Sequence, residues 1–158
     1  MKITKSERFA FLGCLFFGII AHGYMLANNF QYHDDAGFYG VGAGFGLGRG
    51  SNYLISIILK VIFGGELISV PLFNGFLAIL ILSLVSLMII RIIKLNNIFF
   101  ALMTGGIIAV FPSLTSVLGY RFMAYTYALG YLCAAFGVYL VTDEQKSLSF
   151  KKLFASKI

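Results

Sequence analysis

Four long apolar runs separated by polar segments dominate the pattern along the chain. They occupy residues 9–27, 70–93, 96–111 and 121–141. A hydrocarbon layer roughly 30 Å thick needs about 20 helical residues to cross it, and three of the runs approach or exceed that length. The run at 96–111 is shorter, so a helix there has to tilt or pack against its neighbours. The pattern therefore predicts four membrane-spanning helices.

Residues 51–63 have a different pattern, with polar side chains on one helical face. Spacings of three and four residues place these side chains together on a helix. At about 1.5 Å per residue the segment is too short to cross a bilayer. We predict an amphipathic helix in the membrane interface, apolar side down, with a buried re-entrant helix as the alternative. The polar face consists of Arg49, Asn52, Tyr53, Ser56 and Lys60.

Polar and glycine-rich segments separate the predicted spans. Residues 28–69 and 112–120 are predicted to be loops, and residues 142–158 a basic tail. Pro112 is expected to end the third span, because proline lacks the N–H that a helix interior needs. Gly105 and Gly106, near the middle of that span, permit close helix packing.

Composition supports a membrane protein. Apolar residues make up 59% of the chain and charged residues only 11%, against about 25% charged residues in soluble domains. We therefore predict one all-α membrane domain over residues 1–158. The net charge of +6 does not indicate nucleic acid as a partner, because the basic residues lie at the ends of apolar runs. The two cysteines have no CxxC or Cys/His spacing, so neither a disulfide framework nor a metal site is expected from them.

The distribution of basic residues predicts the orientation. With the N-terminus inside, nine Lys and Arg residues lie in inner segments and three in outer segments. Both termini are therefore expected in the cytoplasm, with both predicted loops outside. The three outer basic residues are Arg49, Lys60 and Arg121.

The first predicted outer loop contains the adjacent carboxylates Asp34 and Asp35, two of only six acidic residues. An ionised Asp in hydrocarbon costs at least ~2.5–3.5 kcal/mol, so the pair should lie at the interface or in a wet cavity. Because the two charges repel, either one takes a proton or a cation neutralises both. One Asp could act as general base toward a hydroxyl. The pair could instead hold Mg²⁺ or Mn²⁺ against a phosphate, form a simple ion site, or belong to a solvated turn.

Other polar residues are weaker candidates. The guanidinium groups of Arg49 and Arg121 suit phosphate recognition, although either side chain could instead reach lipid headgroups. His33, beside the Asp pair, could ligate a metal or carry protons, or be an ordinary loop residue. His22, inside the first predicted span, is expected to be packed or to reach toward the interface.

The order of these motifs resembles the start of the GtrII-type glucosyltransferases of bacterial surface polysaccharides, which are similar to the wider GT-C class. The resemblance is carried by a first span followed by Asn28-Asn29-Phe30-Gln31-Tyr32-His33-Asp34-Asp35, then Gly48-Arg49-Gly50, and later Phe111-Pro112-Ser113. It implies transfer of a sugar from a polyprenyl phosphate to a cell-surface polysaccharide such as O-antigen, outside the bacterial inner membrane. It also implies an acidic motif in the first outer loop. Members of this family continue through further spans, so the resemblance covers their N-terminal portion.

The resemblance also implies roles for individual residues. Asp34 or Asp35 would be the catalytic base or the metal partner, and Arg49 would contact the donor phosphate. Arg121, His33 and Tyr32 are the remaining substrate-binding candidates.

Two other functions fit the pattern. A non-enzymatic four-span flippase or accessory protein for lipid-linked sugars would have this size. The ionisable residues, however, cluster outside rather than at mid-membrane, where a transport path would need them. An inactive truncated copy of a transferase is the third possibility.

Overall fold

The computed structural model describes residues 3–28, 57, 60–62, 71–119 and 124–142. Within these residues every regular element is a helix. The helices are α1 (Lys5–Ala27), α4 (Pro71–Ile93), α5 (Ile98–Val110), α6 (Pro112–Gly119) and α7 (Ala124–Thr142).

Three of these helices, α1, α4 and α7, are long and apolar enough to cross a membrane. The helices α5 and α6 meet at a 43° bend and together meet the same test as one broken span. The described part of the chain thus contains three such helices, or up to four spans if the bent pair counts as one. The protein is an all-α polytopic membrane protein, which confirms the predicted fold class.

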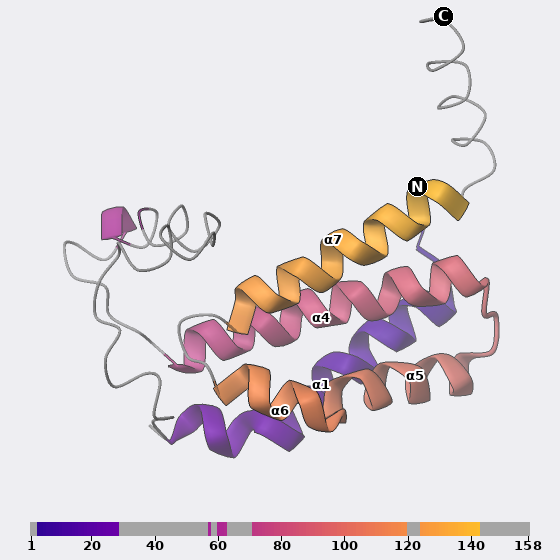
Figure 1. The fold of residues 1–158 in the computed structure, drawn as a ribbon. Helices are drawn as coiled ribbons and strands as arrows, with labels where there is room; N and C mark the ends of the chain where they lie inside the picture. Colours follow the sequence, from indigo (N-terminus) through magenta and orange to yellow (C-terminus); the bar gives the residue numbers. More distant parts are fainter. Residues whose placement is uncertain (1–2, 29–56, 58–59, 63–70, 120–123, 143–158) are drawn as a thin grey trace, which may run out of the picture.

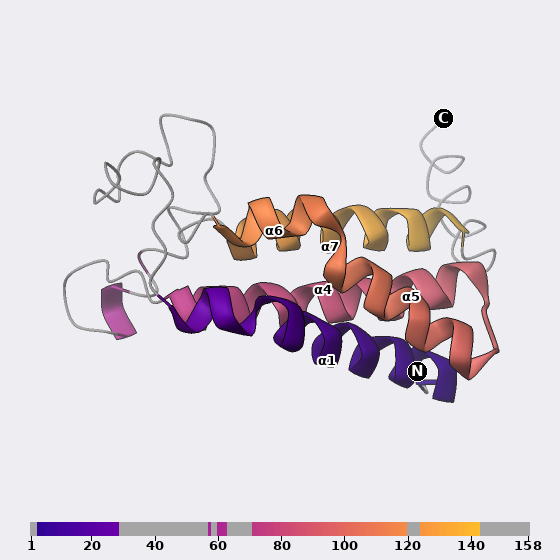
Figure 2. The ribbon, with the colours of Figure 1, turned by 90° about the horizontal axis from the view of Figure 1, so that it is seen from below.

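The helices run alternately up and down (Figures 1 and 2). The start of α1, the link between α4 and α5 and the end of α7 lie at one end of the bundle, which we call the N-terminal end. The end of α1 and the starts of α4 and α7 lie at the other, the far end, together with the end of α6. The alternation agrees with the predicted topology, in which the N-terminus and the link after the second span share one side.

The helix α1 begins at Lys5, four residues before the predicted span, because Thr4 and Glu7 form a capping box. The Glu7 backbone N–H donates to Thr4 Oγ1 at 3.2 Å, and the Thr4 backbone N–H donates to Glu7 Oε2 at 2.9 Å. Such reciprocal bonds satisfy N–H groups that have no partner inside the helix.

The contact between α1 and α5 is made by small residues repeated every fourth position on both helices. This spacing keeps the small side chains on one face, and without large side chains the two backbones come close together. A Cβ atom on Gly105 would collide with the Ala10 carbonyl oxygen and lie 2.9 Å from the Cys14 backbone nitrogen. The predicted close packing at Gly105 is therefore confirmed. The repeated residues are Ala10, Cys14 and Gly18 in α1 and Ala101, Gly105 and Ala109 in α5.

The third predicted span does end before Pro112, but the chain does not continue as a loop. Phe111 is extended, with φ −61° and ψ 131°, as expected for a residue that precedes proline. Pro112 then begins α6, because the first position of a helix needs no N–H. Residues 112–119, predicted as part of an outer loop, are therefore helical.

Little of the predicted interfacial helix falls within the described residues. Residues 57 and 60–62 are helical, and their side chains are exposed. The rest of residues 51–63 lies outside the described part of the chain.

Candidate functional site

The structure does not place the residues that the sequence singled out for chemistry. All of them lie outside the described residues: Tyr32, His33, Asp34, Asp35, Arg49 and Arg121. What the structure does place are the helix ends that flank them. The end of α1, the start of α4, the end of α6 and the start of α7 all lie at the far end of the bundle (Figure 1). Both chain segments that carry the candidates therefore start and finish at one end.

The end of α1 is fixed against the start of α4. Asn28 caps α1, with its backbone N–H and its side-chain Nδ2 donating to the Tyr24 carbonyl at 3.0 and 2.7 Å. Leu26 lies directly against Gly75 of α4, where a Cβ atom would overlap the leucine side chain. The segment that contains Asp34 and Asp35 therefore leaves the bundle from a well-packed point.

The connection that carries Arg121 joins two helices that pack on each other. Leu114 and Leu118 of α6 share one buried core with Ala124, Tyr125 and Ala128 of α7. Residues 120–123 therefore link two fixed helix ends.

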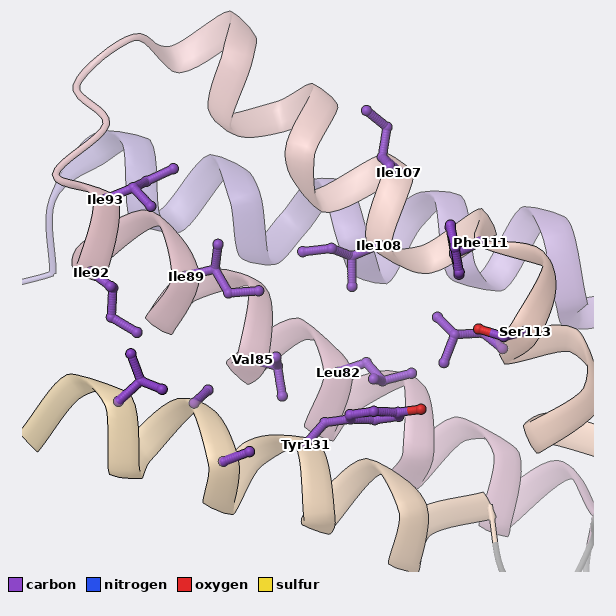
Figure 3. Close-up of a pocket in the computed structure, with 14 residues that line it drawn as sticks. Leu82, Val85, Ile89, Ile92, Ile93, Ile107, Ile108, Phe111, Ser113 and Tyr131 are labelled. Atoms are coloured by element: carbon purple, nitrogen blue, oxygen red, sulfur yellow. The ribbon is translucent and has the colours of Figure 1, made fainter.

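An apolar pocket of about 610 Å³ lies between α4, the α5–α6 pair and α7 (Figure 3). On α4 it is lined by Leu82, Val85, Ile89, Ile92 and Ile93. The eleven helical steps from Leu82 to Ile93, at about 1.5 Å each, give it a length of about 16 Å along the helix.

The opposite walls of the pocket contain two hydroxyl groups. Ile107, Ile108, Phe111 and Leu114 line the α5–α6 side, and Ala134, Ala135 and Val138 line the α7 side. The hydroxyls of Ser113 and Tyr131 lie at the same end of the pocket, on the side nearer α6 (Figure 3).

The lining suits a hydrocarbon chain and not a sugar. Its fourteen residues include no charged side chain. A sugar enclosed there would leave most of its hydroxyl groups without hydrogen-bond partners, at a cost of about 1–3 kcal/mol for each. An aliphatic chain loses nothing comparable. Sequence reasoning did not find this pocket, because the residues that form it come from helices far apart in the chain.

His22 lies at the bend between α5 and α6. Its side chain is only 4% exposed, and Nε2 lies 2.8 Å from the Ala109 carbonyl oxygen. The carbonyl only accepts hydrogen bonds, so Nε2 carries the proton and donates it. Of the two alternatives for this residue, the packed histidine is correct.

Charged groups at the N-terminal end join α1 to α4. Arg91 Nε and Nη2 donate to Glu7 Oε1 and Oε2, each at 2.7 Å. The Ser6 hydroxyl donates to the Asn96 carbonyl at 2.7 Å, which ties α1 to the link before α5. These contacts join α1 to α4 and to the link before α5 at the N-terminal end of the bundle.

The described residues contain no group of three or more His, Cys, Asp or Glu side chains that could hold a metal ion. The predicted Mg²⁺ or Mn²⁺ ligands, Asp34 and Asp35, lie outside those residues. Cys14 is buried and Cys133 exposed, and both are free thiols, in line with the prediction that they form no disulfide.

Comparison with known proteins gives one match. The model of a protein family described as "Glucosyl transferase GtrII" matches residues 23–156. No curated protein and no solved structure matches the chain. The family match begins inside α1, and it includes the first predicted loop, all of the pocket-lining helices and most of the tail.

Proposed function

This chain belongs to the GtrII glucosyltransferase family, and on that premise we propose that it transfers glucose from a polyprenyl-phosphate donor to a cell-surface polysaccharide. The family match over residues 23–156 is the observation that carries the proposal. It favours a transferase over a flippase or an accessory protein.

The apolar pocket supports the choice of donor. A polyprenyl chain is a long branched hydrocarbon, and burial of apolar surface contributes about 25 cal/mol for each Å² removed from water. A pocket about 16 Å long, between helices that cross the membrane, suits several units of such a chain. The phosphate and sugar would then lie toward the far end, where the segments with the polar candidates begin and end.

In the proposed reaction an acceptor hydroxyl attacks the anomeric carbon of glucose. The bond from that carbon to the phosphate oxygen breaks, and the polyprenyl phosphate leaves with the electron pair. Asp34 or Asp35 takes the proton of the attacking hydroxyl. Arg49 stabilises the charge on the leaving phosphate through paired N–H donors.

The remaining candidates bind substrate in this proposal. Arg121 is a second cation near the far end, and His33 and Tyr32 supply hydrogen-bonding groups beside the carboxylates. Each contributes by holding the sugar and the phosphate in a reactive orientation.

A divalent cation is the second role proposed for the carboxylate pair. Mg²⁺ or Mn²⁺ held by Asp34 and Asp35 would neutralise their repulsion and offset the phosphate charge. Loss of transfer in EDTA, restored by either metal, assigns this role to the pair. Undiminished transfer in EDTA assigns the role of base alone.

We propose the bacterial inner membrane as the location, with both termini in the cytoplasm. Lys5, Arg8, Arg91 and Lys94 all lie at the N-terminal end of the bundle. Lys and Arg are enriched in cytoplasmic segments, so the far end is assigned to the outside.

Substitution of the two carboxylates tests the proposed chemistry. Asp34→Asn and Asp35→Asn, made in the full gene, remove the base while keeping the side-chain size. We expect at least one of them to lower glucose transfer to the polysaccharide about 10²–10⁴-fold, the usual contribution of a general base. Glucosylation is measured by mass spectrometry of the isolated polysaccharide.

Asp143→Asn is the matched control, because Asp143 belongs to the acidic pair Asp143-Glu144 in the predicted cytoplasmic tail. It should leave transfer unchanged. Normal glucosylation in both loop variants would show that the carboxylates do not take part in the reaction.

A further inference from the structure

His22 has an unusual position for an ionisable residue. In the described helices α1, α4, α5, α6 and α7, the acidic and basic side chains are confined to the N-terminal end, whereas His22 lies more than four turns into α1. Ionisable side chains inside a membrane are costly and are usually kept for a function. The Ala109 contact indicates what that function is.

Ala109 belongs to the last turn of α5, where carbonyl groups lose their partners inside the helix. The chain is extended at Phe111, so the regular pattern of hydrogen bonds stops there. The Phe111 carbonyl accepts from the Leu114 backbone N–H at 2.9 Å. The Ala109 carbonyl accepts from His22 at 2.8 Å. The bond from His22 therefore joins α1 to the point where α5 ends.

The residues that follow this point form one wall of the apolar pocket. Phe111, Ser113 and Leu114 all line it, from the bend and the first turn of α6 (Figure 3). A change in the angle between α5 and α6 would move these three side chains together. The pocket shape thus depends on the angle at the bend.

We propose that His22 is a positioning residue, which fixes the 43° bend between α5 and α6 and thereby the α6 wall of the pocket. The role of the pocket as a site for a prenyl chain rests on the proposed function, whereas the control of the bend does not. A polar backbone group at membrane depth needs a partner. Without His22 the Ala109 carbonyl would have to find another donor, and the bend would lose the hydrogen bond that joins it to α1.

A distance measurement between α5 and α6 tests this role without any need for activity. Spin labels are placed at Thr104→Cys and Ser116→Cys, in full-length protein in nanodiscs with Cys14 and Cys133 replaced by Ala. Double electron–electron resonance (DEER) spectroscopy should give a narrow distance distribution between the two labels in the parent protein. His22→Leu should broaden or shift it, and His22→Gln should restore it, because the amide N–H can donate to the same carbonyl.

Asn97→Ala is the matched control at the opposite end of α5. The Asn97 side-chain oxygen accepts from the backbone N–H groups of Phe99 and Phe100 at 3.0 and 3.2 Å. Its loss also removes hydrogen bonds at a helix end, yet it should leave the distance distribution narrow. An unchanged distribution in His22→Leu, or equal broadening in Asn97→Ala, would overturn the proposal.

Binding of farnesyl phosphate, a short analogue of the proposed donor lipid, measures the effect on the pocket. We expect His22→Leu to raise its Kd about fivefold to tenfold, the usual scale for one lost hydrogen bond. His22→Gln and Asn97→Ala should stay near the parent value. If the parent protein does not bind farnesyl phosphate, the proposed donor is wrong, and the distance measurement alone still decides the role of His22.

Discussion

At the residue scale, the ion pair between Glu7 and Arg91 shows how the bundle is held at its N-terminal end. The two side chains are 6% and 17% exposed, and two parallel bonds of 2.7 Å join them. Glu7 also closes the capping box at the start of α1. One carboxylate therefore fixes both the beginning of α1 and its contact with the last turn of α4.

Removing one partner of this pair should destabilise the protein strongly. Arg91→Met leaves the Glu7 carboxylate without its two donors, and because the pair is partly buried, we expect a loss of about 1–3 kcal/mol, the cost of an unsatisfied polar group. We expect a clear drop in the Tm of the purified protein in detergent. In the double variant Glu7→Gln, Arg91→Met, the loss should be smaller than the sum of the two single losses.

Arg8→Met is the control for this prediction. Arg8 is exposed at the same end of the bundle, and exposed substitutions usually change stability by less than about 0.5 kcal/mol. Equal Tm values for Arg91→Met and Arg8→Met would contradict the importance of the pair.

At the scale of the elements, the helices differ in how closely they pack. The small residues of α1 and α5 bring the two backbones together, and a Cβ atom has no room at Gly105. In α7, by contrast, no atom of the described residues lies within 4 Å of a Cβ atom built at Gly130 or Gly137. The contact between α1 and α5 therefore brings two backbones together, whereas Gly130 and Gly137 lie on a face of α7 that packs on none of the described helices.

This difference predicts that two similar substitutions affect stability differently. Gly105→Ala should force α1 and α5 apart and destabilise the bundle by about 1–3 kcal/mol, the usual range for overpacking. Gly137→Ala adds the same methyl group where space is open, so packing should not change. Thermal unfolding in detergent compares the two, and similar Tm values for both variants would contradict the close contact.

The sequence allowed these helices to be predicted well, but not all of their boundaries. The apolar runs located α1, α4 and α7, because burial in a membrane imposes a length and a composition that are visible in one segment. The helix α6 was not predicted, because the sequence pattern marks Pro112 only as the end of the preceding span, whereas it also begins the next helix. The partners Glu7–Arg91 and His22–Ala109 were also missed, because they join positions more than eighty residues apart. The candidate carboxylates lie outside the described residues, so their positions remain a prediction.

At the scale of the whole molecule, the α5–α6 pair and α7 flank one face of α4, and the open apolar pocket lies between them (Figure 3). Its lining is apolar, as a hydrocarbon chain requires. Both chain segments that carry the polar candidates begin and end at the far end of the bundle. The molecule thus combines an open apolar pocket between its helices with two candidate-bearing segments that begin and end at one end of the bundle.

Filling the pocket should weaken lipid binding while the protein still folds. Ala135→Phe places a ring in the pocket from α7, and we expect farnesyl phosphate binding and glucose transfer to fall at least about tenfold, equivalent to about 1.4 kcal/mol. Cys133→Phe adds the same ring at an exposed position of α7 outside the pocket lining, and it should leave both unchanged. Unaltered binding in Ala135→Phe would show that the chain does not enter this pocket.

The proposed orientation also has a direct test. Asn28→Cys and Asn96→Cys place single thiols at the far end and the N-terminal end, in protein with Cys14 and Cys133 replaced by Ala. A membrane-impermeant maleimide should label position 28 in intact spheroplasts and position 96 only after permeabilisation. The reverse result would place the segment with Asp34 and Asp35 in the cytoplasm, away from an external polysaccharide.

The close contact between α1 and α5 has a consequence for biogenesis. Ala10 and Ala101 pack in the same interface but are 91 positions apart in the chain. At about 5–20 residues per second, the ribosome takes roughly 5–20 s to reach the second after the first. During that interval the small-residue face of α1 is without its partner, so the insertion machinery or surrounding lipid has to shelter it until α5 enters the bilayer.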